Sequence, residues 1–180
     1  MKLSSRNAFL VLRTYLKNAK PEKYEHSMRV AAISQFLAQI WGESVTDAII
    51  AAMLHDIGKS MSEQQITSLC MRNNIEVHDF DLLETRMALH GKVSALLFER
   101  EFEGNDSERM DKISHAISAH VAGDERMNLL DKIIFIADNV ESKTEGMELL
   151  EQIKAGQIDG PNECVIRIIE QKKKEIDKRD

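Results

Sequence analysis

Residues 54–59, with the sequence Leu-His-Asp-Ile-Gly-Lys, combine ligand types that suit a divalent metal. The pair His55-Asp56 offers a neutral imidazole nitrogen and a carboxylate. Neighbouring side chains on a helix point about 100° apart, so the two converge only where a helix ends. Gly58 predicts that end, because glycine commonly terminates helices. Lys59 adds a cation close by.

The pair needs a helix that delivers it and partners from elsewhere in the chain. The apolar stretch 45–54 predicts the helix, and its small residues Ala48, Ala51 and Ala52 would let other helices approach closely. A second pair, His78-Asp79, lies in the polar stretch 76–81, which we expect to face solvent. One His-Asp pair is therefore weak evidence, and the remaining ligands decide the interpretation.

Composition favours an all-α protein of one domain. The chain has 180 residues, with two prolines and eight glycines. Its net charge of −6 argues against a nucleic-acid-binding protein. We find no membrane-spanning apolar run and no signal peptide. Cys70 and Cys164 lack metal-type spacing and suggest reduced thiols. We therefore expect a cytoplasmic protein.

The second predicted helix, from Pro21 to Gly42, carries the first further candidate. An apolar stripe at helical spacing places one histidine on the buried side of this helix, and consists of His26, Val30, Ile33, Leu37 and Ile40. Arg29 is three residues beyond His26 and could reach the same region. The alternative is a core histidine that bonds a backbone carbonyl.

Two more histidines are selected by local pattern. His90 precedes a predicted helix, and Gly91 removes a side chain that would block close approach to it. Backbone N–H groups at such a helix start suit an anion, although His90 could simply pack there. On the later helix, His120 shares a face with Ile113 and Ile117, whereas His115 falls roughly opposite. We therefore select His120 and expect His115 to be exposed.

Asp138 is the second candidate carboxylate. It shares a helix face with Leu130, Ile134 and Ala137. A carboxylate on an apolar face is costly unless it is paired or bound to a cation. The alternative to a metal is a salt bridge to a buried Arg or Lys.

Together these residues predict metal-assisted hydrolysis of a phosphate ester or anhydride. One ion could bind His26, His55, Asp56 and Asp138, and a second could bind His90 and His120 with Asp56 bridging. A metal lowers the pKa of bound water toward about 7 and polarises a phosphoryl oxygen. Lys59 and Arg29 would neutralise phosphate charge. Such ligands suit iron, manganese, zinc or nickel, as one or two ions.

The order His26, His55-Asp56, Asp138 resembles the HD-domain phosphohydrolase superfamily, which is all-α. Five stretches are more specific, and resemble the bacterial YqeK-type symmetrical bis(5′-nucleosyl)-tetraphosphatases. These stretches are 24–30, 54–59, 90–93, 116–120 and 130–141. The resemblance implies a single HD domain over 1–180, an HD-type helical bundle with core motifs at 24–141 and closing helices at 145–178.

The resemblance also implies an activity and a division of roles. Diadenosine tetraphosphate would be cleaved symmetrically into two ADP by a metal-bound water, with iron as the metal. His26, His55, Asp56 and Asp138 would hold the ion. The nucleotide would contact some of these ligands and further residues, and the full set is His26, Arg29, Asp56, Lys59, His90, His120, Val121, Asp138 and Lys143. We expect Asp56, Lys59, His90 and His120 to be catalytic.

Three departures from the family pattern concern the phosphate loops. The HD pair is followed by Ile57-Gly58-Lys59 instead of Tyr-Ala-Lys, and residues 124–127 replace an Arg-Pro-Gly-Met-like loop. After Glu141 the chain has Ser-Lys-Thr instead of Pro-Asn-Arg, so the usual arginine is missing and the neighbouring Lys143 could replace it as a less specific phosphate ligand. Two alternatives follow: another HD nucleotide phosphohydrolase, or a nucleotide-binding regulatory module with little turnover. We expect a small-molecule partner, no nucleic acid and no membrane, and leave open a homodimer.

Overall fold

The computed structural model describes residues 1–75, 89–104, 106–121, 127–142 and 144–176. Within these ranges the protein is helical, and the only β pairing is an isolated bridge between Lys2 and Glu103. This confirms the all-α prediction. The elements are α1 (Ser5–Leu16), α2 (Pro21–Trp41), α3 (Val45–Leu54), the 3₁₀ turn η1 (Ile57–Ser60), α4 (Glu63–Arg72), α6 (Leu89–Glu101), α7 (Ser107–Ala119), α8 (Leu129–Ser142), α9 (Thr144–Lys154) and α10 (Pro161–Ile176).

Local sequence signals set several helix ends. The side chain of Ser44 caps α3 by accepting from Asp47 N, and Ser62 forms a reciprocal capping box with Gln65 on α4. Pro21 lies in the first turn of α2, as predicted. Gly42 ends α2 with φ 76°, a left-handed conformation that favours glycine.

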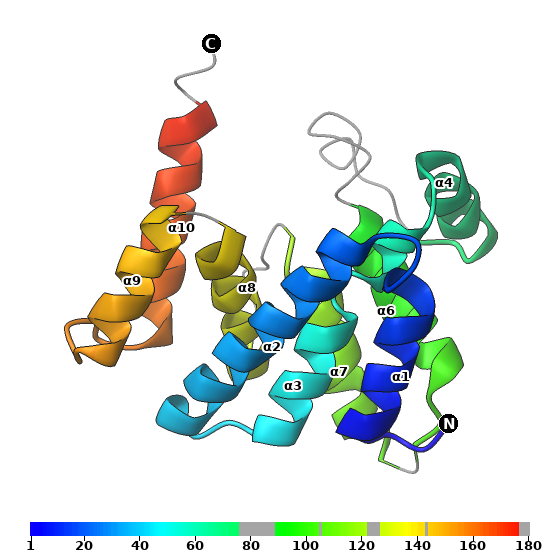
Figure 1. Ribbon diagram of the computed structural model, residues 1–180, viewed down its shortest axis with the longest axis horizontal. Helices are drawn as coiled ribbons and strands as arrows, with labels where there is room; N and C mark the ends of the chain where they lie inside the picture. Colours follow the sequence, from blue (N-terminus) through cyan, green and yellow to red (C-terminus); the bar gives the residue numbers. More distant parts are fainter. Residues whose placement is uncertain (76–88, 105, 122–126, 143, 177–180) are drawn as a thin grey trace.

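Helices α2 and α3 lie side by side at the centre of the molecule (Figure 1). Helix α8 packs on α2 and α7, while α9 and α10 cover α8 at one end of the molecule. Helix α4 projects at the opposite end. None of the described helices is long and apolar enough to cross a membrane.

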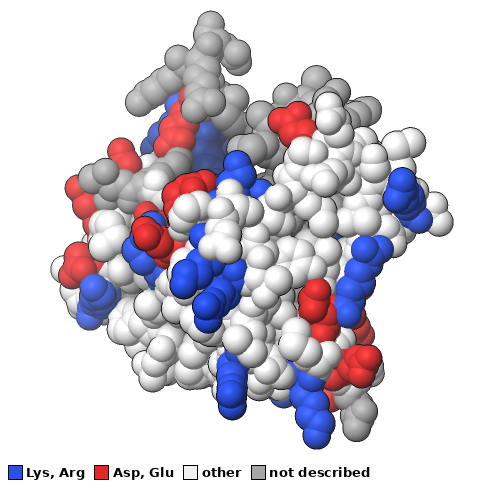
Figure 2. Space-filling view, turned by 45° about the vertical axis from the view of Figure 1, so that its right-hand side comes forward, with Lys and Arg blue, Asp and Glu red and all other residues white. Residues whose placement is uncertain are grey.

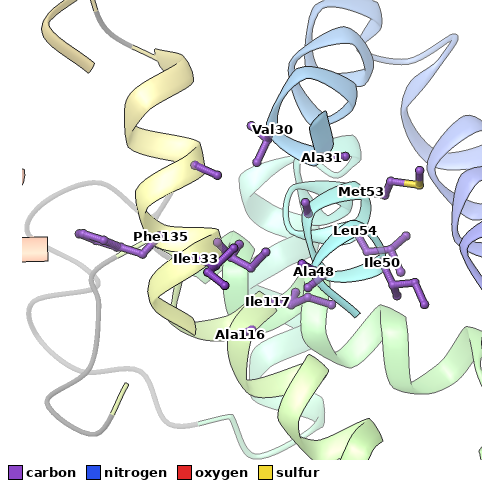
Figure 3. Close-up of a cluster of buried hydrophobic side chains, with 14 of the residues drawn as sticks. Val30, Ala31, Ala48, Ile50, Met53, Leu54, Ala116, Ile117, Ile133 and Phe135 are labelled. Atoms are coloured by element: carbon purple, nitrogen blue, oxygen red, sulfur yellow. The ribbon is translucent and has the colours of Figure 1, made fainter. Parts of the chain in front are cut away.

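The core lies between α2, α3, α7 and α8 (Figure 3). Leu54, Ile117 and Ile133 are fully buried there. The small residues of α3 are also buried, and allow the close helix approach that the sequence predicts: Ala48, Ala51 and Ala52. Phe135 extends from α8 on the side away from α3, where Lys172 Nζ of α10 lies 4.9 Å from its ring centroid.

The predicted apolar stripe of α2 is wrong at its end. Ile40 is 46% exposed, although His26, Val30 and Leu37 are buried as expected. The buried face is rotated toward Ser34 and Ala38, because α3 packs closely on that small-residue side.

Gly58 was predicted to terminate the α3 helix, and this is also wrong. The helix ends at Leu54, and Gly58 lies in η1 without a positive φ. A Cβ at this position would lie 2.6 Å from the backbone oxygen of His90 and 3.0 Å from Ser94 Oγ. Gly58 N donates to Ser94 Oγ at 2.9 Å. The glycine is therefore required because α6 approaches the turn closely.

Candidate metal and catalytic centre

Six polar side chains from separate parts of the chain meet in one place. They come from the first half of α2, the α3–η1 junction, the first turn of α6, the end of α7 and the middle of α8. These are His26, His55, Asp56, His90, His120 and Asp138. All four imidazoles and Asp56 are buried. The structure therefore brings together every residue that the sequence predicted as a metal ligand.

The first set of ligands surrounds one point. His26 Nε2 lies 3.0 Å from Asp138 Oδ1, and His55 Nε2 lies 3.6 Å from the same oxygen. Asp56 Oδ2 lies 3.5 Å from His55 Nε2 and 3.7 Å from His26 Nε2. Ligands about 2.1 Å from a common ion lie roughly 3.0 to 3.4 Å apart in octahedral or tetrahedral geometry. These separations fit a single ion with a slight contraction of the site.

The second oxygen of Asp56 faces a different pair of imidazoles. Asp56 Oδ1 lies 3.1 Å from His90 Nε2 and 3.6 Å from His120 Nε2. The two Nε2 atoms are themselves 3.1 Å apart. Asp56 thus lies between the two predicted ligand sets, in the position of a bridging carboxylate.

Backbone carbonyls fix the orientation of two imidazoles. His55 Nδ1 lies 2.6 Å from Ala52 O, and His120 Nδ1 lies 2.7 Å from Ile117 O. A carbonyl only accepts, so Nδ1 must carry the proton, and the Nε2 lone pair is left facing the centre. This is the tautomer that a metal requires.

Glu141 supports the centre and was missed by the sequence reasoning. Its Oε2 accepts from His26 Nδ1, and its Oε1 accepts from Arg29 Nε. A carboxylate on the remote nitrogen orients a metal-binding imidazole and raises its basicity. The available signal was its position one turn after Asp138 on the same helix. Arg29, predicted to bind phosphate, is 57% exposed and is paired with Glu141.

Two buried atoms test whether these residues fit a metal. His55 Nε2 and Asp56 Oδ1 are buried and make no hydrogen bond among the described residues. Leaving such groups unpaired is costly, and native proteins rarely do so. A divalent cation at the centre would satisfy both atoms, so the donor set fits a bound metal.

Burial and the neighbouring charged groups shift the pKa values of the residues in the centre. Burial would raise the pKa of Asp56 and Asp138, but the surrounding imidazoles hold both pKa values well below the usual range. Burial lowers the pKa of His120 to about 4. For His55 burial also lowers the pKa, but Asp56 and Asp138 outweigh it and the net pKa is raised. At neutral pH both carboxylates are therefore ionised and His120 is neutral.

The remaining predicted residues lie around the centre or outside the described ranges. Lys59 Nζ lies 2.8 Å from Asp56 Oδ2. Val121 is half-buried beside Gly91, where an added Cβ would lie 3.1 Å from Val121 Cγ2 and 2.9 Å from Ser118 O. Lys143, the pair at 78–79 and residues 124–126 lie outside the described part of the chain.

His115 is separate from the centre, as expected, but it is not fully exposed. Its side chain is 42% exposed, and Nδ1 lies 2.9 Å from Asp131 Oδ2. Asp131 is fully buried and also accepts from Asn128 N at 2.7 Å, at the start of α8. The sequence analysis did not foresee this bond, because it placed His115 by helix face alone.

Comparison with known proteins identifies the family. The model of the HD domain matches residues 24–143, a range that includes every residue of the centre. The chain belongs to the HD domain family. Its match to this family agrees with the resemblance seen in the sequence.

Relatives within the HD domain family carry a more specific name. The symmetrical bis(5′-nucleosyl)-tetraphosphatase of Staphylococcus aureus is 32% identical over 130 residues, 69% of this chain and 62% of that protein. The proteins of the same name from Bacillus subtilis and Halalkalibacterium halodurans are 32% and 29% identical over 120 and 119 residues, each 66% of this chain. The chain thus spans about three-fifths of the length of the curated relatives it matches, at 62%, 61% and 60%.

Solved structures share the helical arrangement. A predicted HD superfamily hydrolase involved in NAD metabolism from Clostridium acetobutylicum superposes with a TM-score of 0.82 and 25% identity, over 99% of this chain and 90% of that one. A predicted HD superfamily hydrolase from an uncultured Thermotogales bacterium has a TM-score of 0.54 and 16% identity, over 97% and 92% of the two chains. The second match concerns the fold alone.

Proposed function

We propose that this protein is a metal-dependent hydrolase that cleaves diadenosine tetraphosphate symmetrically into two ADP. The observation that carries the proposal is the buried cluster of metal-type ligands in which His55 Nε2 and Asp56 Oδ1 have no hydrogen bond. The substrate is suggested by the name of the relatives from Staphylococcus aureus and Bacillus subtilis.

The ligands proposed for the ion are His26, His55, Asp56 and Asp138, with Asp56, His90 and His120 for a second ion if one binds. Iron is the proposed metal, and manganese, zinc and nickel suit the same ligands. A bound divalent ion would lower the pKa of water and polarise a phosphoryl oxygen.

The chain's own residues would carry out three tasks in the reaction. Water adds to one of the two central phosphorus atoms, and the bond from that atom to the central bridging oxygen breaks, so that each half leaves as ADP. Lys59, close to Asp56, would bind phosphoryl oxygens. His120 Nδ1 is bonded to the Ile117 carbonyl, so its Nε2 lone pair would be available to accept the proton of the attacking water, and His90 Nε2 lies 3.1 Å from it. Glu141 would hold His26 in place.

A substrate panel tests the proposal. Metal-loaded protein is assayed with diadenosine tetraphosphate, ATP, ADP and AMP, and kcat/KM is compared among them. We expect the dinucleotide to be preferred at least about tenfold, and we expect the activity to be lost in Asp138→Asn together with bound metal. A preference for a mononucleotide would instead identify another HD nucleotide phosphohydrolase. Tight ADP binding with negligible turnover of all four would favour the regulatory alternative.

A further inference from the structure

The hydroxyl of Ser94 links two elements that carry groups of the metal centre. Ser94 is fully buried on α6, one turn after His90. Its Oγ accepts a hydrogen bond from Gly58 N of η1 at 2.9 Å. The hydroxyls of Ser27 and Ser34 are also buried, but they have no hydrogen-bond partner among the described residues. The bond of Ser94 is therefore not a general property of buried serines in this fold.

The donor in this bond is one that the start of a helix leaves unpaired. Asp56 is the N-cap residue of η1, and Lys59 N donates to Asp56 O at 2.9 Å as the first bond of the turn. Gly58 N precedes that bond, so it has no partner within the turn. Gly58 is buried, and an unpaired donor there would be costly. Ser94 Oγ supplies the missing acceptor from a different helix.

The cap from α6 leaves the side chain of Asp56 available to the centre. An aspartate at an N-cap commonly accepts from the first backbone N–H groups with its own carboxylate. Asp56 makes no such bond. Instead, its Oδ2 lies 2.8 Å from Lys59 Nζ, and its Oδ1 lies 3.1 Å from His90 Nε2. The turn is thus capped without using the carboxylate that lies between the two predicted ligand sets.

The contact of Gly58 with α6 also fixes the position of His90. A Cβ at Gly58 would lie 2.6 Å from His90 O and 3.2 Å from Ser94 N. These two atoms belong to one helical turn, so Gly58 packs directly on the turn that carries His90. Glycine is required there, and it stands where the family pattern has alanine. A shift of α6 along η1 would break the Ser94 bond and change the distance from His90 to Asp56.

We infer that Ser94 is a positioning residue of the centre, which caps η1 from α6 and holds His90 beside the carboxylate of Asp56. Its effect on turnover passes through His90. The first set of metal ligands comes from α2, α8 and the end of α3, and does not depend on α6. Loss of the hydroxyl should therefore lower turnover and leave the binding of that ion unchanged. The inference rests on the proposed function for the reaction, but not for the arrangement of the side chains.

Ser94→Ala tests this role, because it removes the hydroxyl and adds no larger group. With metal-loaded protein and diadenosine tetraphosphate, we expect kcat to fall about tenfold and KM to change less than about twofold. Metal affinity, measured by competition with a chelator, should also change less than about twofold. A double-mutant cycle with His90→Ala then shows whether Ser94 acts through His90. In the His90→Ala background, Ser94→Ala should lower kcat less than about twofold.

Ser34→Ala is the matched control, because Ser34 is a fully buried serine of α2 whose hydroxyl bonds none of the described residues. Its kcat should equal that of the wild type. An unchanged kcat in Ser94→Ala would overturn the role of Ser94. The same tenfold loss in the His90→Ala background would overturn it too, because Ser94 would then act without His90.

A measurement without substrate separates this inference from the proposed function. Nitrogen-15 NMR of the zinc-loaded protein reports the environment of the His90 ring, whose signals are assigned by their loss in His90→Ala. These signals should move in Ser94→Ala and stay in place in Ser34→Ala. If the wild type fails to cleave the dinucleotide but the His90 signals respond in this way, the positioning role stands and the proposed function falls. Signals that stay in place in Ser94→Ala would refute the positioning role.

Discussion

Three of the four imidazoles of the centre are oriented by a bond at Nδ1, the ring nitrogen that faces away from it. His55 and His120 bond backbone carbonyls three residues earlier, and His26 bonds the carboxylate of Glu141. A carbonyl is always an acceptor, so these bonds fix the tautomer. The carboxylate bond to His26 is different in kind, because it adds charge as well as orientation.

Glu141→Gln should therefore weaken metal binding without removing a ligand. We expect about a 10- to 100-fold loss of metal affinity, because the amide keeps the length but not the charge that raises the basicity of His26. Competition with a coloured chelator measures the affinity. Glu145→Gln, at an exposed position on α9, is the control and should bind metal as the wild type does. Equal affinities in the two variants would contradict the role of Glu141.

Substitution of His120 should mainly lower activity, whereas substitution of His115 should mainly lower the stability of the fold. His120→Ala should lower kcat at least about 100-fold, because it removes a group of the centre. His115→Ala should leave kcat nearly unchanged but destabilise the fold by ~1–3 kcal/mol, because Asp131 is fully buried and loses a partner. Steady-state kinetics and urea unfolding measure the two effects. Equal losses of activity would refute the assignment.

At the scale of elements, the centre depends on the close approach of α6 to the η1 turn. Gly58→Ala would place a Cβ 2.6 Å from the backbone oxygen of His90, so α6 must shift and carry His90 with it. We expect a destabilisation of ~1–3 kcal/mol together with a loss of activity.

Gly42→Ala is the comparison for that variant. Gly42 has φ 76° and nothing within 4 Å of an added Cβ, so it should cost ~1 kcal/mol through the backbone alone. Activity should be retained, because Gly42 lies at the far end of α2 from His26. Kinetic assays and denaturant unfolding of both variants decide the matter, and full activity in Gly58→Ala would count against the packing argument.

The same two glycines show what the sequence can predict about elements. Gly42 ends α2 as its pattern indicates, because the left-handed turn is a local requirement. Gly58 follows an apolar helix in a similar way, yet its requirement comes from α6, more than 30 residues away in the sequence. The prediction that Ile40 is buried is wrong for the same reason, because packing on α3 decides which face of α2 is buried. Local signals thus predict helix ends, whereas contacts between helices decide the rest.

At the scale of the molecule, metal should link the segments that form the centre. Removal of metal by a chelator should lower Tm, because the ion binds only the folded arrangement of α2, α3 and α8. The Tm difference between loaded and chelated protein should be larger at pH 8 than at pH 6. The pKa of His55 is raised, so its proton competes with the ion as the pH falls.

Differential scanning calorimetry of both forms at each pH measures this linkage. The chelated sample corrects for the pH dependence of the fold itself. Asp138→Asn should show little effect of the chelator at either pH, because it lacks one proposed ligand. A Tm that is independent of metal at both pH values would show that the cluster is not a metal centre.

Much of the centre could be predicted from the sequence because its ligands lie on apolar helix faces or at the ends of helices. His120 and Asp138 were selected in this way, and the structure places both with His55 and Asp56. Glu141 was not selected by that argument, since it lies at the edge of the buried face of α8. Its position one turn after Asp138 is a local signal, but its bonds to His26 and Arg29 depend on the packing of α8 against α2. The charged surface gives no further indication of a binding site on the face shown in Figure 2, because basic and acidic side chains are interspersed there.

The central claim is symmetrical, metal-dependent cleavage by this centre. The most direct measurement is hydrolysis of diadenosine tetraphosphate in ¹⁸O-labelled water by iron-loaded protein, with separation and mass analysis of the nucleotides. The account predicts ADP as the sole nucleotide product, half of it carrying one ¹⁸O on the terminal phosphate, and no reaction with chelator or with Asp56→Ala. AMP together with ATP, or turnover that persists without metal, would contradict it.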